Sequence, residues 1–214
     1  MKYTHIIWDF NGTLFNDIEA GIASVNTMLE ERGLPKLSGV EDYRKVFKFP
    51  IIEYYRDLGF DFDREPYAKL APIWVDLYNI NSKTSKLQVG AAEALEYCAK
   101  SGVSQVLLSA TERNMLIGQI KELKIYGYFN EIMGLDDIHA YSKRELAVQW
   151  WQRNPDAIPL FIGDTEHDAD VARAIGADCI LVCNGHQSRE RLQKLGCDVF
   201  DDLSAVFKLL QLTK

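Results

Sequence analysis

Short apolar runs that alternate with helical patterns constrain the fold of this chain more than any other feature. Continuous apolar runs of this kind are typical of strands buried on both faces of a parallel sheet. They occupy residues 5–8, 106–108, 160–162, 180–182 and 199–200. Apolar residues at helical spacing lie between the later runs, over residues 91–100, 111–123, 143–153 and 169–175. The alternation predicts an α/β fold with a doubly wound parallel sheet.

One long stretch interrupts this alternation. Residues 17–86 contain no convincing buried strand and show helical patterns instead, over residues 18–32, 40–46, 51–58 and 66–80. A crossover between neighbouring strands needs far fewer residues than this. We therefore expect residues 16–86 to form an inserted helical cap over the carboxyl edge of the sheet. The core domain would then comprise residues 1–15 and 87–214, and the polar segment 79–86 would be the return linker.

Composition and charge exclude several classes of protein. The 214 residues are 47% hydrophobic and 26% charged, which is ordinary for a globular protein with a sizeable core. A net charge of −7 argues against a partner bound through a nucleic-acid backbone. No apolar run approaches the length of a membrane span, and the first residues lack a signal-peptide pattern. The four cysteines form no C-x-x-C pair. We expect reduced thiols, a cytoplasmic location and no membrane partner, while the oligomeric state is left open.

Charged and hydroxyl side chains follow three of the apolar runs. Asp9 comes after the first run, Ser109 after the second, and Asp164 and Asp168 after the third, while Lys143 opens a predicted helix. The carboxyl ends of parallel strands meet at one edge of a sheet, where ligands bind. Clustered carboxylates repel one another unless a cation neutralises them. Aspartate, carbonyl and water ligands suit Mg²⁺, so the pattern predicts a magnesium site beside a phosphate.

Each of these residues also has a purely structural interpretation. Asp9 alone is compatible with a turn cap, and Ser109 begins an S-x-x-E capping box. Lys143 near a helix start is compatible with a solvated lysine, and Asp164 and Asp168 with helix N-terminal acids. The functional interpretation is favoured because all five occur together, each at a strand end or a helix start.

The same residues resemble the four motifs of the haloacid dehalogenase-like hydrolase superfamily. Residues 9–14, D-F-N-G-T-L, are similar to its first motif, D-x-D-G-T-L, and residues 163–168, G-D-T-E-H-D, to its fourth, G-D-x-x-x-D. Ser109 and Lys143 fall where the second and third motifs are expected. The resemblance covers nearly the whole chain. The helical insert is similar to the cap of the phosphoglycolate phosphatase and β-phosphoglucomutase branch.

The resemblance implies a catalytic mechanism and a metal. Asp9 would attack phosphorus and form an aspartyl-phosphate that water then hydrolyses. Mg²⁺ would be bound by Asp9, the backbone carbonyl of Asn11 and Asp164, with Asp168 helping directly or through water. The metal would cancel the repulsion between an anionic nucleophile and an anionic phosphate.

The predicted substrate contacts come from both parts of the chain. Thr13, Ser109 and Lys143 would hold phosphate oxygens, and Lys143 would also neutralise charge near Asp9. In the cap, Lys48 lies in a predicted interhelical loop and is a candidate contact for a substrate anion. The cap would exclude water from the site and determine which small phosphorylated metabolite binds.

Asn11 departs from the resemblance. Phosphatases of this superfamily normally have a second aspartate here, which protonates the leaving group and then deprotonates water. An amide hydrogen-bonds but carries no transferable proton, and general acid–base catalysis contributes about 10²–10⁴-fold. We therefore expect a weak or leaving-group-selective Mg²⁺-dependent phosphatase. Glu166 and His167 are the nearest candidates for a replacement proton carrier, although His167 is also compatible with an exposed loop residue or a helix N-terminal residue.

Two other functions remain open at this point. Because of Asn11, one alternative is a non-catalytic protein that binds a phosphorylated metabolite. The other is a related hydrolase such as a phosphonatase, in which a cap lysine forms a Schiff base with the substrate, and Lys48 is the candidate. A haloacid dehalogenase is disfavoured because the Mg²⁺ carboxylates are retained.

Overall fold

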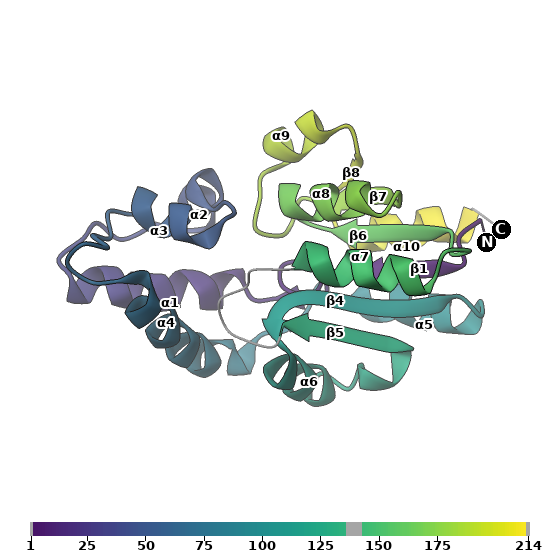
Figure 1. Ribbon diagram of the computed structural model, residues 1–214, viewed down its shortest axis with the longest axis horizontal. Coiled ribbons are helices and arrows are strands. Elements are labelled where there is room, and N and C mark those ends of the chain that lie inside the picture. The colour runs from purple at the N-terminus through teal and green to yellow at the C-terminus, as the bar shows by residue number, and fades with distance from the viewer. Residues whose placement is uncertain (1, 136–142, 213–214) are drawn as a thin grey trace.

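The computed structural model describes residues 2–135 and 143–212, and its centre is a six-stranded parallel sheet (Figure 1). The strand order is β5-β4-β1-β6-β7-β8. The strands are β1 (His5–Trp8), β4 (Ser104–Glu112), β5 (Glu131–Leu135), β6 (Pro159–Gly163), β7 (Asp178–Val182) and β8 (Asp198–Phe200). Trp8 at the end of β1 pairs with Leu107 of β4 and Ile162 of β6. The residues after these three strand ends therefore meet at one edge, and the predicted doubly wound fold is confirmed.

Both faces of the sheet are buried, because successive strand residues point to opposite sides. Ile6 and Trp8 belong to the cluster beneath α5 (Ala91–Lys100), α6 (Arg113–Glu122) and α10 (Leu203–Leu212). Ile7 belongs to the cluster beneath α7 (Lys143–Arg153) and α8 (Glu166–Ala174). In Figure 1, α7 lies in front of the sheet, and α5 and α10 lie behind it. The continuous apolar runs are explained by this two-sided burial.

Four helices lie beside the carboxyl end of the sheet and have a hydrophobic core of their own (Figure 1). They are α1 (Ile18–Glu31), α2 (Val40–Val46), α3 (Ile51–Asp57) and α4 (Tyr67–Asn81). Val25, Met28, Leu29 and Leu70 are fully buried among them. We call these four helices the cap. The chain leaves the sheet through β2 (Phe15–Asn16) and returns through β3 (Lys86–Leu87), and these two strands pair antiparallel.

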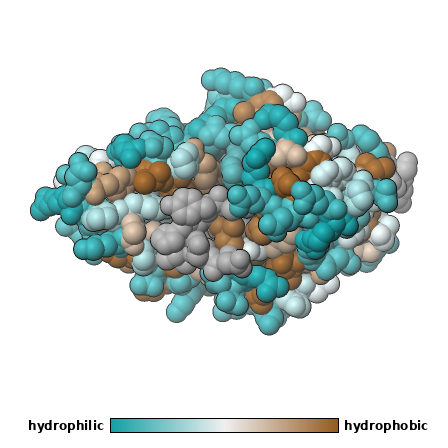
Figure 2. Space-filling view, viewed as in Figure 1, coloured by the Kyte–Doolittle hydropathy of each residue, from teal (hydrophilic) through white to brown (hydrophobic). Residues whose placement is uncertain are grey.

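Three details differ from the predicted pattern. Strand β5 was not expected, and helix α8 begins at Glu166 rather than at residue 169. The expected linker 79–86 is instead the end of α4, a short 3₁₀ turn (Ser82–Thr84) and the start of β3. The surface seen in Figure 2 is mostly hydrophilic and carries separate hydrophobic patches. Among the helices of the described ranges, none is both long enough and apolar enough to cross a membrane.

Candidate active site

The loop after β1 brings the backbone close to the site. Gly12 has a φ of +76°, which a glycine adopts without strain. A Cβ there would lie 2.3 Å from Oδ2 of Asp164 and 2.5 Å from the His186 ring. The Gly12 N–H donates to Oδ1 of Asp17 at 2.9 Å, and its carbonyl accepts from Gln88 at 3.1 Å. Glycine is therefore required at position 12, because both the conformation and the close approach exclude a side chain.

Three buried carboxylates and one buried lysine meet at the carboxyl edge of the sheet. Asp9, Asp164 and Asp168 each offer an oxygen, and these atoms lie within 4.8 Å of one another. The Nζ of Lys143 bonds Oδ1 of Asp9 and lies 2.5 Å from Oδ1 of Asp168. The Lys143 side chain is 3% exposed, so the alternative interpretation of a solvated lysine is wrong. Oxygen ligands grouped in this way fit a hard cation such as Mg²⁺.

Local hydrogen bonds hold two of these carboxylates in place. Oδ1 of Asp164 accepts from Thr13 Oγ1 at 3.1 Å, and Oδ2 accepts from the N–H of His186 at 2.5 Å. Oδ2 of Asp168 accepts from Thr165, through its N–H at 2.9 Å and its Oγ1 at 2.7 Å. Thr165 is the N-cap of α8 and completes a capping box with Asp168. Asp168 thus caps a helix with one oxygen and faces Lys143 with the other.

The pKa values of the carboxylates show how strongly the site favours an added positive charge. Burial raises the pKa of Asp9 to about 8; the charges of Asp168 and Asp164 add to this, and Lys143 opposes it. Burial and the charge of Asp168 raise the pKa of Asp164, also to about 8. Burial acts on Asp168 as well, but Lys143 and Thr165 hold its pKa below the ordinary value. A cation between Asp9 and Asp164 would stabilise both as anions.

Replacing Lys143 by methionine is expected to lower the free energy of unfolding by about 3–5 kcal/mol, the usual cost of removing one partner of a buried ion pair. Asp9 and Asp168 would then be buried without their nearest positive charge. Urea denaturation at pH 8 without divalent cations measures the loss. Lys100→Met is the control, since Lys100 makes an exposed ion pair with Glu96 and should leave stability nearly unchanged. Equal losses in both variants would contradict the assignment of Lys143.

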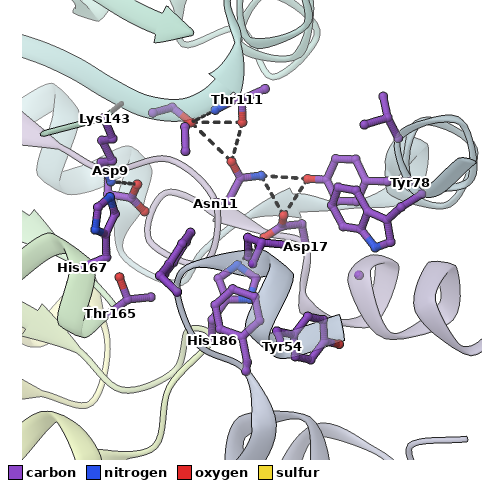
Figure 3. Close-up of a pocket in the computed structure, with 18 of the residues that line it drawn as sticks. Asp9, Asn11, Asp17, Tyr54, Tyr78, Thr111, Lys143, Thr165, His167 and His186 are labelled. Atoms are coloured by element: carbon purple, nitrogen blue, oxygen red, sulfur yellow. Dashed lines mark hydrogen bonds and ion pairs between the residues drawn. The ribbon is translucent and has the colours of Figure 1, made fainter. Parts of the chain in front are cut away.

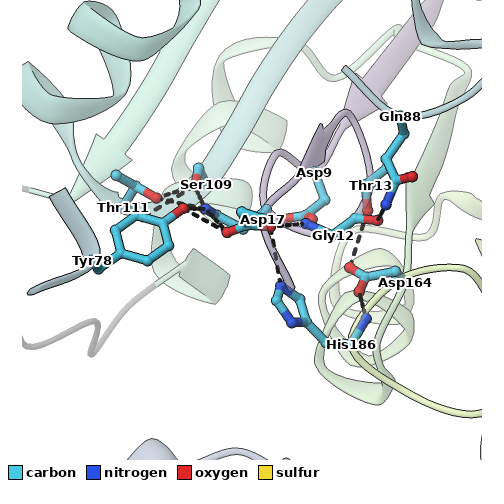
Figure 4. A network of polar contacts seen from close by, with 12 residues as sticks. Asp9, Gly12, Thr13, Asp17, Tyr78, Gln88, Ser109, Thr111, Asp164 and His186 are labelled. Carbon is cyan, nitrogen blue, oxygen red and sulfur yellow. Dashed lines mark hydrogen bonds and ion pairs between the residues drawn. The ribbon is translucent and has the colours of Figure 1, made fainter. Parts of the chain in front are cut away.

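A polar network that includes Asp17, Tyr78 and Thr111 reaches into the cap (Figure 4), and Asn11 lies among these side chains (Figure 3). Its Nδ2 donates to Oδ2 of Asp17 and to the hydroxyl of Tyr78, both at 2.8 Å. Its Oδ1 accepts from Thr111 Oγ1 at 2.7 Å and from Ser109 Oγ at 3.4 Å. The Tyr78 hydroxyl also donates to Asp17 at 2.5 Å. An amide serves this position well, because it donates to a carboxylate with one end and accepts from hydroxyls with the other.

A cavity of about 180 Å³ lies between this polar cluster and the cap (Figure 3). On the sheet side it is lined by Asp9, Asn11, Ser109, Lys143, Asp164 and Asp168. On the cap side its wall is mostly aromatic, formed by Tyr43, Phe47, Phe49, Tyr54, Tyr55, Tyr67, Trp74 and Tyr78. Such a cavity suits a small ligand with one anionic end and one apolar end.

Comparison with known proteins identifies the family. The haloacid dehalogenase-like hydrolase family matches residues 6–182. The chain belongs to this family. A phosphoglycolate phosphatase of Pseudomonas syringae pv. tomato is 26% identical to this hydrolase over 209 residues, which are 92% of this chain and 76% of the relative. That of Pseudomonas savastanoi pv. phaseolicola is 24% identical over 211 residues, with 92% and 76% covered.

Two solved structures show that this hydrolase shares its whole architecture with known proteins. A haloacid dehalogenase-like family hydrolase from Streptococcus pneumoniae superimposes with a TM-score of 0.82 at 20% identity, covering 98% of this chain and 99% of the other. Protein Tyrosine Kinase A from Mycobacterium tuberculosis gives 0.81 at 18% identity, covering 98% of each chain. These likenesses support the fold, and the two proteins' names differ in the reaction they describe.

The structure places the sequence-predicted residues of this hydrolase in three ways. Six of them line the cavity, namely Asp9, Asn11, Ser109, Lys143, Asp164 and Asp168. Thr13 is fully buried behind them, where it holds Asp164. Lys48 lies 2.5 Å from Asp57 in an ion pair, and it is not among the described residues that line the cavity.

The two candidate proton carriers differ in their surroundings, since only His167 lines the cavity. Glu166 is bound by Arg191 at 2.5 and 3.1 Å. His167 lines the cavity, its ring lies 4.8 Å from that of Phe49, and burial lowers its pKa. His167 is the second residue of α8 and is only partly exposed, so the helix N-terminal position left open by the sequence is correct and the exposed loop position is wrong.

Three residues of the site were missed in the sequence. His186 follows β7 at the same edge, and its Nδ1 lies 2.8 Å from the Tyr43 hydroxyl. The strand-end rule applied to β7 would have found it. Asp17 and Tyr78 have no such signal, because Asp17 precedes the first cap helix and Tyr78 lies near the end of the fourth. Only the packing of the cap against the sheet brings these two to Asn11.

Proposed function

We propose that this hydrolase is a Mg²⁺-dependent phosphatase that acts on a small phosphorylated metabolite through an aspartyl-phosphate on Asp9. The observation that supports this most is the position of Asp9. It is buried at the end of the central strand, bonded to Lys143, and grouped with two further carboxylates beside the cavity. The names of the relatives, phosphoglycolate phosphatases, agree with phosphomonoester hydrolysis.

The residues present fit a magnesium ion. Asp9, Asp164 and the carbonyl of Asn11 would hold it, with Asp168 acting through water because its two oxygens already bond Lys143 and cap α8. When bound, Mg²⁺ supplies positive charge that lets an anionic carboxylate approach an anionic phosphate.

The chain's own groups then have distinct roles. A carboxylate oxygen of Asp9 attacks phosphorus, and the leaving group departs with the electron pair of its bond. Ser109 Oγ and Lys143 Nζ, which line the cavity beside Asp9, hold the phosphoryl oxygens. Water then attacks the phosphorus of the aspartyl-phosphate, which releases phosphate and restores the carboxylate.

The alternatives are less well supported. A phosphonatase needs a cap lysine in the cavity, but Lys48 is paired with Asp57, and among the described lining residues Lys143 is the single lysine. A binding protein without activity is favoured only by Asn11. Activity is supported because Asp9, the other two carboxylates, Ser109 and Lys143 all line the cavity.

Loss of the Asp164 carboxylate tests the metal site. We expect Asp164→Ala to abolish Mg²⁺ binding measured by isothermal titration calorimetry, because it removes one of two carboxylates whose charges the ion would neutralise. The matched control is Asp170→Ala, since Asp170 is an exposed aspartate of α8 that pairs with Arg173. Unchanged Mg²⁺ affinity in Asp164→Ala would contradict the assignment.

A further inference from the structure

We propose that the leaving group of the substrate is a planar apolar ring, so that the site takes an aryl phosphate and rejects the carboxylate-bearing phosphoglycolate. The proposal rests on the phosphatase function proposed above and assigns its substrate class. Two independent features carry it, namely the wall of the cavity and the residue at position 11.

On the cap side of the cavity, the rings of five lining residues form a connected set. The ring of Phe47 lies 5.1 Å from Tyr43, 5.5 Å from Phe49 and 5.4 Å from Tyr54, centroid to centroid. Tyr54 in turn lies 5.7 Å from Tyr55. These spacings are those of edge-to-face and offset-stacked pairs. The rings fix one another, so the wall presents a shaped aromatic surface before any ligand binds.

The cap offers no positive charge to a second anionic group. Arg44 donates to the backbone carbonyls of Gly185 and Asn184, both at 2.8 Å. Lys48 and Arg56 pair with acidic residues of α3, and Lys69 is exposed. None of these four cations is among the described residues that line the cavity.

The remaining basic side chains of the described lining are Lys143, His167 and His186. His167 packs against Phe49, and burial lowers its pKa, which favours its neutral form. Lys143 lies between Asp9 and Asp168. His186 contacts the Tyr43 hydroxyl through Nδ1, and its Nε2 lies 3.6 Å from Asp17. Among the described lining residues the carboxylate of phosphoglycolate would therefore find no counter-ion, and burying an unpaired charge beside a mostly aromatic wall is costly. An uncharged ring would gain from the same surroundings.

Asn11 points to the same substrate class for a separate reason. Position 11 supplies no proton donor, so the site favours a leaving oxygen that is stable as an anion. A phenol has a pKa of about 10, as in tyrosine, so its anion is far more stable than an alkoxide. In the first step the Asp9–phosphorus bond forms, and the phosphorus–oxygen bond breaks with its electron pair left on the aryl oxygen. The aryl oxide takes a proton from solvent. Water attack in the second step returns the Asp9 carboxylate and releases inorganic phosphate.

The first measurement compares kcat/KM for phenyl phosphate and phosphoglycolate in the presence of Mg²⁺. We expect kcat/KM to be at least about 10²-fold higher for phenyl phosphate. A positioned proton donor contributes about 10²–10⁴-fold, and only the alkyl ester needs one. A preference for phosphoglycolate would overturn the proposal and leave the phosphatase function standing.

A second pair of substrates separates ring binding from leaving-group reactivity. Benzyl phosphate and ethyl phosphate both release alkoxides, but only the first has a ring to place against the wall. We expect KM to be about 10- to 100-fold lower for benzyl phosphate, as follows from burying an aromatic group. Equal KM values would overturn the assignment of the wall.

Binding to the Asp9→Asn variant distinguishes failure of this proposal from failure of the catalytic function. Suppose that the wild type hydrolyses none of the four esters but that the variant, measured by calorimetry, binds phenyl phosphate more tightly than phosphoglycolate. The proposed substrate class is then supported, and the proposed catalytic function is wrong. Weaker or equal binding of phenyl phosphate overturns the pocket.

A charge placed in the wall should reverse the selectivity. Ile51, the first residue of α3, lines the cavity. Ile51→Arg is expected to lower the ratio of kcat/KM for phenyl phosphate over phosphoglycolate by at least about tenfold, because a charged hydrogen bond then becomes available to the glycolate carboxylate. Ile51→Met is the matched control and should not shift the ratio toward phosphoglycolate. An unchanged ratio in Ile51→Arg would overturn the charge argument.

Discussion

Replacing Asp9 by asparagine is expected to lower turnover of phenyl phosphate by roughly 10⁴-fold or more, since an amide is not a competent nucleophile and no other route to the covalent intermediate remains. The substitution preserves shape in a closely packed site. Burial already favours the uncharged form of Asp9, whose pKa is about 8, so the neutral amide should be tolerated there. The loss would then reflect chemistry and leave the fold intact, which thermal unfolding of the variant checks.

A phosphoryl mimic tests the same residue without turnover. Beryllofluoride in the presence of Mg²⁺ should bind the wild type and fail to bind Asp9→Asn, as measured by ¹⁹F NMR. Asp42→Asn is the control, because Asp42 is a partly exposed aspartate of α2 that pairs with Lys45 and is not among the described residues of the cavity lining. An Asp9→Asn variant that keeps the wild-type rate would show that the covalent mechanism is wrong.

The second large effect is expected from exchanging two side chains. Asn11→Asp alone places a carboxylate where Asn11 now donates to Asp17 at 2.8 Å. Two carboxylates at this distance resist ionising together, so that one proton is shared between them. Asn11→Asp combined with Asp17→Asn keeps one amide and one carboxylate in contact, and the amide introduced at position 17 then donates to the new acid. Tyr78 retains an acceptor, and the Gly12 N–H can still bond an oxygen at position 17.

We expect this exchanged pair to hydrolyse ethyl phosphate about 10²–10⁴-fold faster than the wild type, which is the usual contribution of a positioned acid and base. Phenyl phosphate should gain much less, because its leaving group needs no proton. Asp17→Asn alone is the control and adds no acid at position 11. Mass spectrometry of fresh protein excludes prior deamidation at Asn11-Gly12. If ethyl phosphate is already hydrolysed quickly and the exchange adds nothing, another group moves the proton. His167→Ala should then lose the rate.

The fold was predictable where burial leaves a clear pattern. Strands β1, β4, β6 and β7 are covered on both faces and therefore appear as uninterrupted apolar runs. Strand β5 lies at the edge of the sheet, and Gly134 interrupts its run. A Cβ at Gly134 would lie 2.8 Å from the backbone of Thr111 and Arg113, so glycine is required there. Close packing against the β4–α6 junction therefore requires a glycine inside β5, and this glycine breaks the continuous apolar run by which a buried strand is predicted.

The sequence predicted the site residues that the sheet contributes, but not those that the cap contributes. Parallel strands bring Asp9, Ser109 and Asp164 to one edge, whatever the loops do. The alternative interpretation of Ser109, as the first residue of a capping box, is wrong. The N-cap of α6 is Glu112, which caps the helix with its own side chain, while Ser109 bonds Asn11 and Thr111. In the cap, nothing in the sequence around Lys48 indicates whether its ammonium group faces the cavity or pairs with a carboxylate. Its partner Asp57 is nine positions away and becomes a neighbour only through the loop between α2 and α3.

The paired strands β2 and β3 have a consequence for how such an enzyme changes over evolution. The cap joins the sheet at one place, where Phe15 pairs with Leu87, so a recombination event with both breakpoints there would exchange the whole cap. Such an event would leave Asn11 behind and carry away Tyr78 and Asp17, both of which bond it. The incoming cap would meet a residue selected against different neighbours. Lineages that acquire a new cap in this way should therefore also have to change position 11.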